Sequence, residues 1–135
     1  MSNLSSISLT LHGPLHSLNN RRAVFYSPKE GRVVNYKRTE VRVMMDKMIW
    51  EAKQGYRAEC KKQKLPYRPL TGRVMLSAWI HYRSEKNDLD DSLLCNILQA
   101  AGVIENDRQI KFKMLSKWVD RKDPRVEVSV VVCDP

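Results

Sequence analysis

The sequence predicts a single α+β domain with two main helices and a mixed sheet of four strands or slightly more, in the order β-α-β-α-β-β. Three observations predict this class. Four segments alternate apolar and polar residues as strands do, and two repeat apolar residues every three or four positions as helices do. The length of 135 residues fits one domain, covering residues 1–135, that buries its own core.

The first half of the chain predicts a short strand at Ile7–Leu11, a further short strand at Ala23–Tyr26 and a long helix at Tyr36–Lys64. We expect Gly55 to end or bend this helix, and Pro66 forbids its continuation. Its basic outer faces fit a solvated surface and a flank for DNA equally well. Its apolar stripe, typical of a core-facing helix, comprises Val41, Met44, Met45, Met48, Ile49, Ala52, Tyr56 and Cys60.

The second half predicts a strand at Arg73–Arg83 that is buried on much of both faces. A second helix over Leu93–Ala101 follows and is closed by Gly102. The strand at Ile110–Val119 has one apolar side and one lysine-bearing side. A short polar turn joins it to a last strand at Val126–Val132, and this arrangement suggests a hairpin.

The charge of the chain points to a polyanionic partner. Twenty-four Lys and Arg against 15 Asp and Glu give a net charge of +9 and an isoelectric point near 9.7. Such a field attracts polyanions, and nucleic acid is the first candidate. The alternative is a basic surface that serves solubility alone.

Several other classes lack support in the sequence. No apolar run approaches the roughly 18 residues of a membrane-spanning helix, and no signal peptide is visible, so we expect a cytoplasmic protein without a membrane partner. No phosphate-binding glycine loop is present, so we expect no nucleotide cofactor. The three cysteines and three histidines lack the spacing of a metal site, and we interpret them as structural residues: Cys60, Cys95, Cys133, His12, His16 and His81.

Three acidic residues are the best candidates for chemistry. Asp88 and Asp90 lie two residues apart before the second helix, so both carboxylates can face one point, and Asp107 follows that helix. Converging carboxylates repel one another unless a cation lies between them, and Mg²⁺ prefers such oxygen ligands. The alternatives are ordinary: Asp90 or Asp91 caps the second helix, and Asp107 is a turn residue.

Two segments carry a family resemblance: Lys86–Asp91, and Ala101–Ile110 with its Glu-Asn-Asp-Arg-Gln run. They resemble the RusA-type Holliday-junction resolvases of bacteria and phages. Ser8–Leu11, Pro14 and Asn19-Asn20 are similar to that family's opening strand and loop.

The resemblance implies a homodimeric α+β nuclease that needs Mg²⁺ or Mn²⁺ and cuts four-way DNA junctions by paired nicks. It implies Asp88, Asp90 and Asp107 as catalytic metal ligands, with Asp91 as a possible fourth. A dimer with twofold symmetry suits a junction of near-twofold symmetry.

The sequence departs from the family pattern at three positions. Asp91 stands in place of an asparagine, Asn106 stands in place of the first acidic residue of the later pair, and the family's helix lysine has no counterpart. We expect Lys86 or Lys111 to supply the missing positive charge.

Further basic residues are predicted to contact DNA phosphates, which position a nucleic acid without reading its sequence. The alternative for the lysines of the later strand is a solvated strand face. Two other functions stay open: a non-catalytic DNA- or RNA-binding protein of the same fold, and a dimeric scaffold for an acidic protein. The predicted DNA-contacting residues are Lys86, Lys111, Lys113, Lys117, Arg21 and Arg22.

Overall fold

The computed structural model describes residues 6–16, 24–27, 32–35, 38–87 and 89–133. It confirms the α+β class, with two helices and a four-stranded mixed sheet in the predicted order. Most bounds agree with the sequence prediction within two residues. The elements of this body are β1 (Ser6–His12), α1 (Arg38–Gln63), β4 (Val74–Tyr82), α2 (Ser92–Ala100), β5 (Ile110–Val119) and β6 (Arg125–Val132).

The strand order of the sheet is β1-β6-β4-β5, with β4 and β5 parallel and the other neighbours antiparallel. The predicted hairpin of the last two strands is therefore wrong, because β5 and β6 lie on opposite sides of β4. Their connection crosses the end of β4, where the Asp120 backbone N–H donates to the Tyr82 carbonyl oxygen over 2.8 Å. This crossing lets the apolar side of β6 fill the core between β1 and β4.

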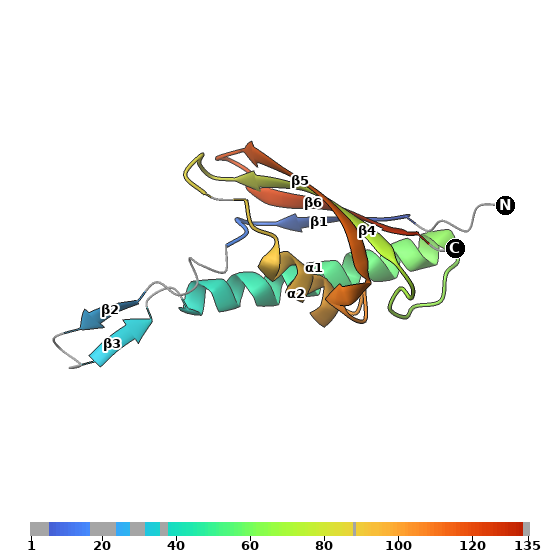
Figure 1. Ribbon diagram of the computed structural model, residues 1–135, viewed down its shortest axis with the longest axis horizontal. Coiled ribbons are helices and arrows are strands. Elements are labelled where there is room, and N and C mark those ends of the chain that lie inside the picture. Colours follow the sequence, from blue (N-terminus) through green and yellow to red (C-terminus); the bar gives the residue numbers. More distant parts are fainter. Residues whose placement is uncertain (1–5, 17–23, 28–31, 36–37, 88, 134–135) are drawn as a thin grey trace.

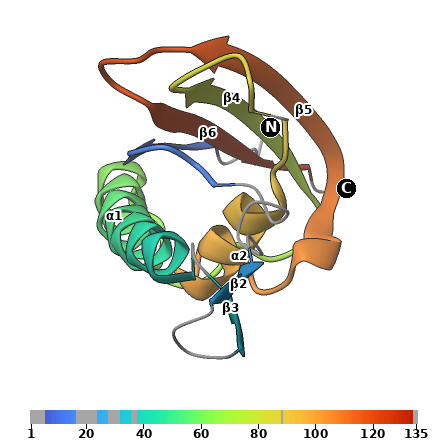
Figure 2. The same ribbon diagram turned by 90° about the vertical axis from the view of Figure 1, so that its left-hand side faces the viewer.

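Both helices cover the same face of the curved sheet, and the other face is open (Figure 2). The core forms where the predicted apolar stripe of α1 and the helix α2 meet the inward residues of β1, β4 and β6. Gly55 does not end α1, because the helix continues through it to Gln63. A Cβ at Gly55 would lie 2.9 Å from Leu9 Cδ2, so this glycine lets α1 pack closely on β1.

Strands β4 and β5 are less covered than the sequence suggested. The inward side of β4 is buried, but Trp79 on its other side is 40% exposed. On β5, Leu115 packs against the core, while Phe112 and Met114 are 65% and 63% exposed. Lys113 pairs in register with the buried Leu76, so the lysine side of β5 faces the helices and its apolar side is open.

A second, two-stranded sheet pairs β2 (Val24–Ser27) with β3 (Arg32–Asn35). It lies away from the main sheet, beyond the start of α1 (Figure 1). Strand β2 overlaps the predicted strand at Ala23–Tyr26, whereas β3 was not predicted. In the part of the chain that the structure describes, no helix is long and apolar enough to cross a membrane.

Candidate active site

The loop from β4 to α2 carries the first acidic segment. The Asp90 backbone N–H donates to the Tyr82 hydroxyl over 3.3 Å. Its Oδ1 accepts from the backbone N–H and the hydroxyl of Ser92, at 2.9 and 2.7 Å. These bonds fix one carboxylate oxygen of Asp90 at the start of α2. Asp88, the other predicted ligand of this loop, lies outside the described residues.

Asp91 occupies the N-cap position of α2, but its side chain makes no capping hydrogen bond. Its Oδ2 instead lies 3.0 Å from Lys113 Nζ on β5. The same oxygen accepts a 3.4 Å hydrogen bond from the thiol of Cys95. The carboxylate is thus directed across to the sheet and away from the helix axis, and an ordinary capping role does not account for it.

Asp107 opens a short 3-10 helix, η2 (Asp107–Gln109), and is exposed. Asn106 caps this helix by accepting from the Arg108 backbone N–H over 2.9 Å. Gln109 completes a capping box, because its Oε1 accepts from the backbone N–H groups of Glu105 and Asn106 at 2.7 and 3.0 Å. The asparagine that departs from the family pattern therefore has a local structural role.

Gln109 also ties η2 to the segment before β4. Its Nε2 donates to the carbonyl oxygens of Leu70 and Gly72, at 2.8 and 2.9 Å. The same amide thus holds Asp107 in place relative to the sheet. Sequence reasoning included Gln109 only in the run that resembles the family and gave it no role, although the Asn-x-x-Gln spacing of a capping box is visible in the sequence.

Lys113 pairs with the first acidic segment and is influenced by the charge of the second. Its hydrogen bond with Asp91 raises the pKa of its ammonium, and the charges of Asp91 and Asp107 act in the same direction. Burial raises the pKa of the Cys95 thiol to about 12, and Asp91 and Asp107 both add to this effect. Asp91 contacts both Lys113 and Cys95, whereas Asp107 acts on them through its charge and makes no contact with either.

The oxygen chemistry of this region suits a hard divalent cation. Within the described residues, which omit Asp88, no three His, Cys, Asp or Glu side chains are close enough to hold a metal ion. A set built on Asp90 and Asp107 therefore depends on Asp88 or on rearrangement of Asp91. The protonated Cys95 thiol is a poor metal ligand and nucleophile in this state.

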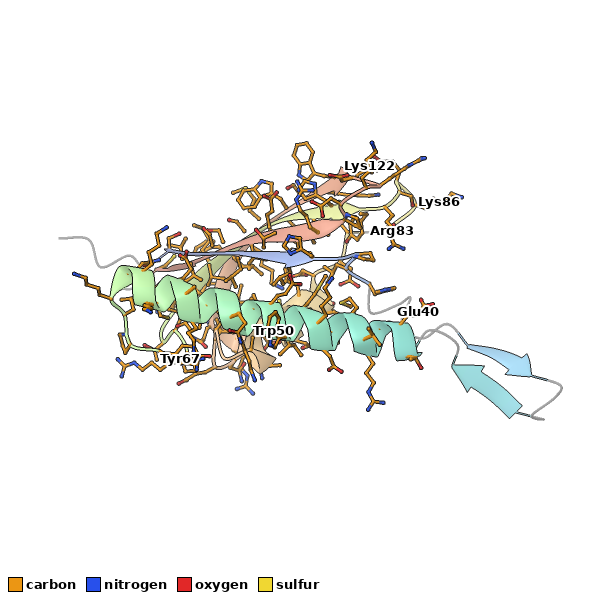
Figure 3. The ribbon with its side chains drawn as sticks, turned by 180° about the vertical axis from the view of Figure 1, so that it is seen from behind. Glu40, Trp50, Tyr67, Arg83, Lys86 and Lys122 are labelled. Atoms are coloured by element: carbon orange, nitrogen blue, oxygen red, sulfur yellow. The ribbon has the colours of Figure 1, made fainter. Side chains whose placement is uncertain are left out.

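A cleft of about 580 Å³ opens next to the loop between β4 and α2. It lies between the loop after β1, the first turns of α1 and the end of β4, and Figure 3 shows Glu40 and Arg83 at this end of the molecule. Tyr82, whose hydroxyl accepts from Asp90, forms part of its wall. The basic lining residues Lys47 and Arg83 are not among the predicted phosphate contacts, although Lys47 belongs to the basic outer faces of α1.

The predicted phosphate-contacting residues differ in their surroundings. Lys86 and Lys111 are exposed, and Arg21 and Arg22 lie outside the described residues. Lys117 Nζ donates to the Glu85 carbonyl oxygen over 2.7 Å and lies 3.7 Å from its carboxylate. With the Lys113–Asp91 pair, this contact means that the lysine side of β5 holds the loop between β4 and α2 and is not simply a solvated strand face.

Two of the histidines have acidic partners. His12 Nδ1 lies 2.7 Å from Glu51 Oε2, and His81 Nε2 lies 3.0 Å from Glu127 Oε2. Both contacts fit the structural role predicted for them.

The comparisons with known proteins add no relative: no family model matches the chain, and no curated protein matches it. The resemblance to RusA-type resolvases therefore stays a prediction made from the sequence. The function is inferred from the side chains and their geometry.

Proposed function

We propose that the protein is a metal-dependent, structure-selective endodeoxyribonuclease that cuts four-way DNA junctions by paired nicks. In this proposal it acts as a RusA-type homodimer in DNA recombination and repair in the cytoplasm. The observation that supports it best is the 3.0 Å contact between Lys113 Nζ and Asp91 Oδ2. The charge of Asp107 acts on the same ammonium without contacting it.

Asp88, Asp90 and Asp107 would hold Mg²⁺ or Mn²⁺, with Asp91 as a possible fourth ligand. A bound metal of this kind supplies an activated water and stabilises the charge that develops on the attacked phosphate. Ser92 holds Oδ1 of Asp90 at the start of α2, and in this proposal the Asp90 carboxylate positioned there is one of the metal ligands.

The basic residues of the chain have two roles in this proposal. Lys113 neutralises Asp91 and brings a positive charge to the carboxylates, which on their own would repel a phosphate. Lys86, Lys111 and Lys117, with Arg21 and Arg22, contact the DNA backbone. The net charge of +9 favours capture of the junction from solution.

The alternative is a non-catalytic DNA-binding protein of the same fold. One observation favours it: Asp90 and Asp91 already bond to Ser92 and Lys113, as structural carboxylates do. This alternative predicts salt-sensitive junction binding without metal-dependent cleavage.

The experiment is cleavage of an end-labelled synthetic four-way junction with Mg²⁺, Mn²⁺ or EDTA. Wild type is compared with Asp90→Asn, and Asp46→Asn on the exposed side of α1 is the matched control. We expect symmetric paired nicks that need metal, disappear in Asp90→Asn and persist in Asp46→Asn. Junction binding without nicks in either metal would overturn the proposal in favour of the alternative.

A further inference from the structure

The open face of the sheet carries an unusual group of side chains. Trp79 on β4 and Phe112, Met114 and Trp118 on β5 are 40%, 65%, 63% and 51% exposed. The two strands are neighbours, so these side chains form one ridge, which we call the apolar ridge. Single exposed apolar residues are common on protein surfaces, but four on adjacent strands form a contiguous patch of a kind that marks interaction sites.

A shallow groove lies beside the apolar ridge on the same face. It has a volume of about 470 Å³ and runs over β1 and β6. Trp79 forms its boundary with the ridge, so the two features share one wall. The remaining lining residues are Ser8, Leu9, Thr10, Glu127, Val128 and Ser129.

The charges of this face do not suit a nucleic acid. Arg125 is neutralised by contacts with Asp120, Asp123 and Glu127, at 2.9, 3.6 and 3.7 Å. His81 is bonded to Glu127 and stacks on Trp118, with ring centroids 6.2 Å apart. Platforms that stack bases combine aromatic residues with a positive groove that follows the backbone. Here the groove contains Glu127, and Lys113 and Lys117 of β5 bond to the loop on the helix side of the sheet.

We infer that the open face binds the same face of a second copy of this chain, and that this surface is the interface of the homodimer. A twofold axis that runs along the strands would exchange the two lateral halves of the face. The apolar ridge of each copy would then lie over the groove of the other. Such a contact is self-complementary, as a twofold interface requires.

The size of the face is adequate for this partner. Three of the four ridge residues are aromatic, and a large aromatic side chain offers about 150–250 Å² of surface. At their exposures of 40–65% the ridge supplies roughly half of the about 800 Å² per partner of a stable interface, and the residues along the groove add to it. Aromatic residues and methionine are also the types enriched at such interfaces.

The inference takes the homodimer of the proposed function as its starting point and assigns it a surface. Stacking the two sheets leaves both helical layers on the outside. Asp91 and Lys113, which lie on the helix side of β5, stay outside the interface and accessible to DNA. The dimer surface and the cleavage site can therefore be altered separately.

The test is the molar mass in solution at micromolar concentration, measured by sedimentation velocity. Wild type is compared with Met114→Glu in the apolar ridge and with Trp50→Glu on α1. Trp50 is 62% exposed on the helical layer, away from the open face, and is the matched control. The thermal unfolding midpoint of each variant shows whether it is folded.

We expect wild type and Trp50→Glu to sediment at twice the chain mass of 15.7 kDa, and folded Met114→Glu to sediment at 15.7 kDa. A monomeric wild type, or a Met114→Glu protein that stays dimeric, would overturn the inference. If wild type is monomeric and Trp118→Ala weakens binding to a single-stranded oligonucleotide, the face is a nucleic-acid platform instead. A dimer without nuclease activity would overturn the proposed function but would not contradict the inferred interface.

Discussion

The two sides of strand β5 carry different chemistry on the same ten residues. Toward the helices, Lys113 and Lys117 bond to Asp91 and to the Glu85 carbonyl oxygen, at 3.0 and 2.7 Å. On the open side, Phe112 and Met114 are mostly exposed. The side of an edge strand that faces the core is thus not always its more apolar side, because long lysine stems pack while their ammonium groups reach carboxylates. An apolar side left open instead indicates a partner.

The largest effect that separates the two sides concerns cleavage. We expect Lys113→Ala to lower the junction cleavage rate by roughly 100-fold or more, as loss of a charge-stabilising group at a reacting phosphate does. Junction affinity should change only a few-fold. Single-turnover cleavage and a binding titration in EDTA measure the two quantities.

The control for this variant is Lys117→Ala, which removes a lysine from the same side of β5 but not from Asp91. An equal loss of cleavage in both variants, matched by an equal loss of affinity, would show that Lys113 only holds DNA.

The next effect concerns stability and compares two adjacent residues. Leu115 packs against the core, so we expect Leu115→Ala to cost about 1–3 kcal/mol of unfolding free energy, less than a fully buried leucine can cost. Met114→Ala should cost less than about 0.5 kcal/mol in the monomer, because the side chain is 63% exposed. Urea unfolding of both variants, at a protein concentration low enough to exclude self-association, measures the two costs. Equal costs would contradict the orientation of β5.

Alkaline pH tests the helix side of β5 in a third way. The pKa of the Cys95 thiol is raised to about 12 from 9.0, so the folded state retains its proton where the unfolded state loses it. This contribution is complete below pH 9.0 and is lost as the pH rises toward 12, with a slope of up to about 1.4 kcal/mol per pH unit. Lys113, whose pKa is also raised, acts in the same direction above 10.5.

We therefore expect the free energy of unfolding to fall above pH 9 in wild type and to fall less steeply in Cys95→Ala. Thermal or urea unfolding across this pH range measures the slope. Identical slopes would mean that Cys95 does not lie in the environment described.

The smallest effect concerns the salt dependence of junction binding. Lys86 is exposed at the loop between β4 and α2, so Lys86→Ala should reduce the slope of log affinity against log salt by about 1. Lys53→Ala, on the exposed side of α1, should leave that slope unchanged. A larger change of this slope in Lys53→Ala than in Lys86→Ala would indicate that the DNA contacts the outer faces of α1.

The fold was predictable where the pattern of apolar residues is compatible with only one type of element and one set of bounds. Strand β5 was located to the residue, and the end of α2 followed from Gly102, whose backbone is left-handed with φ of 77°. The polar turn 120–124 misled because its length fits both a hairpin and a crossing over the end of β4. Which side of β5 faces the core depends on its partner strand, which local alternation does not reveal.

The candidate site was predictable only as a set of residues. The sequence indicated Asp90, Asp91 and Asp107, but not that Lys113 contacts Asp91. That contact exists because β5 pairs in parallel with β4, a long-range feature that no local pattern encodes. The capping role of Gln109, in contrast, could have been predicted from its spacing from Asn106, although the sequence analysis assigned it none.

The most direct test of the central claim, that two acidic segments form one metal site, is binding of Mn²⁺ in the absence of DNA. Loss of the free-ion electron paramagnetic resonance signal measures it for wild type, Asp90→Asn, Asp107→Asn and the control Asp46→Asn. We expect saturable binding by wild type and Asp46→Asn, and clearly weaker binding when either Asp90 or Asp107 is changed. Equal binding by all four proteins, or none by wild type, would contradict a shared site.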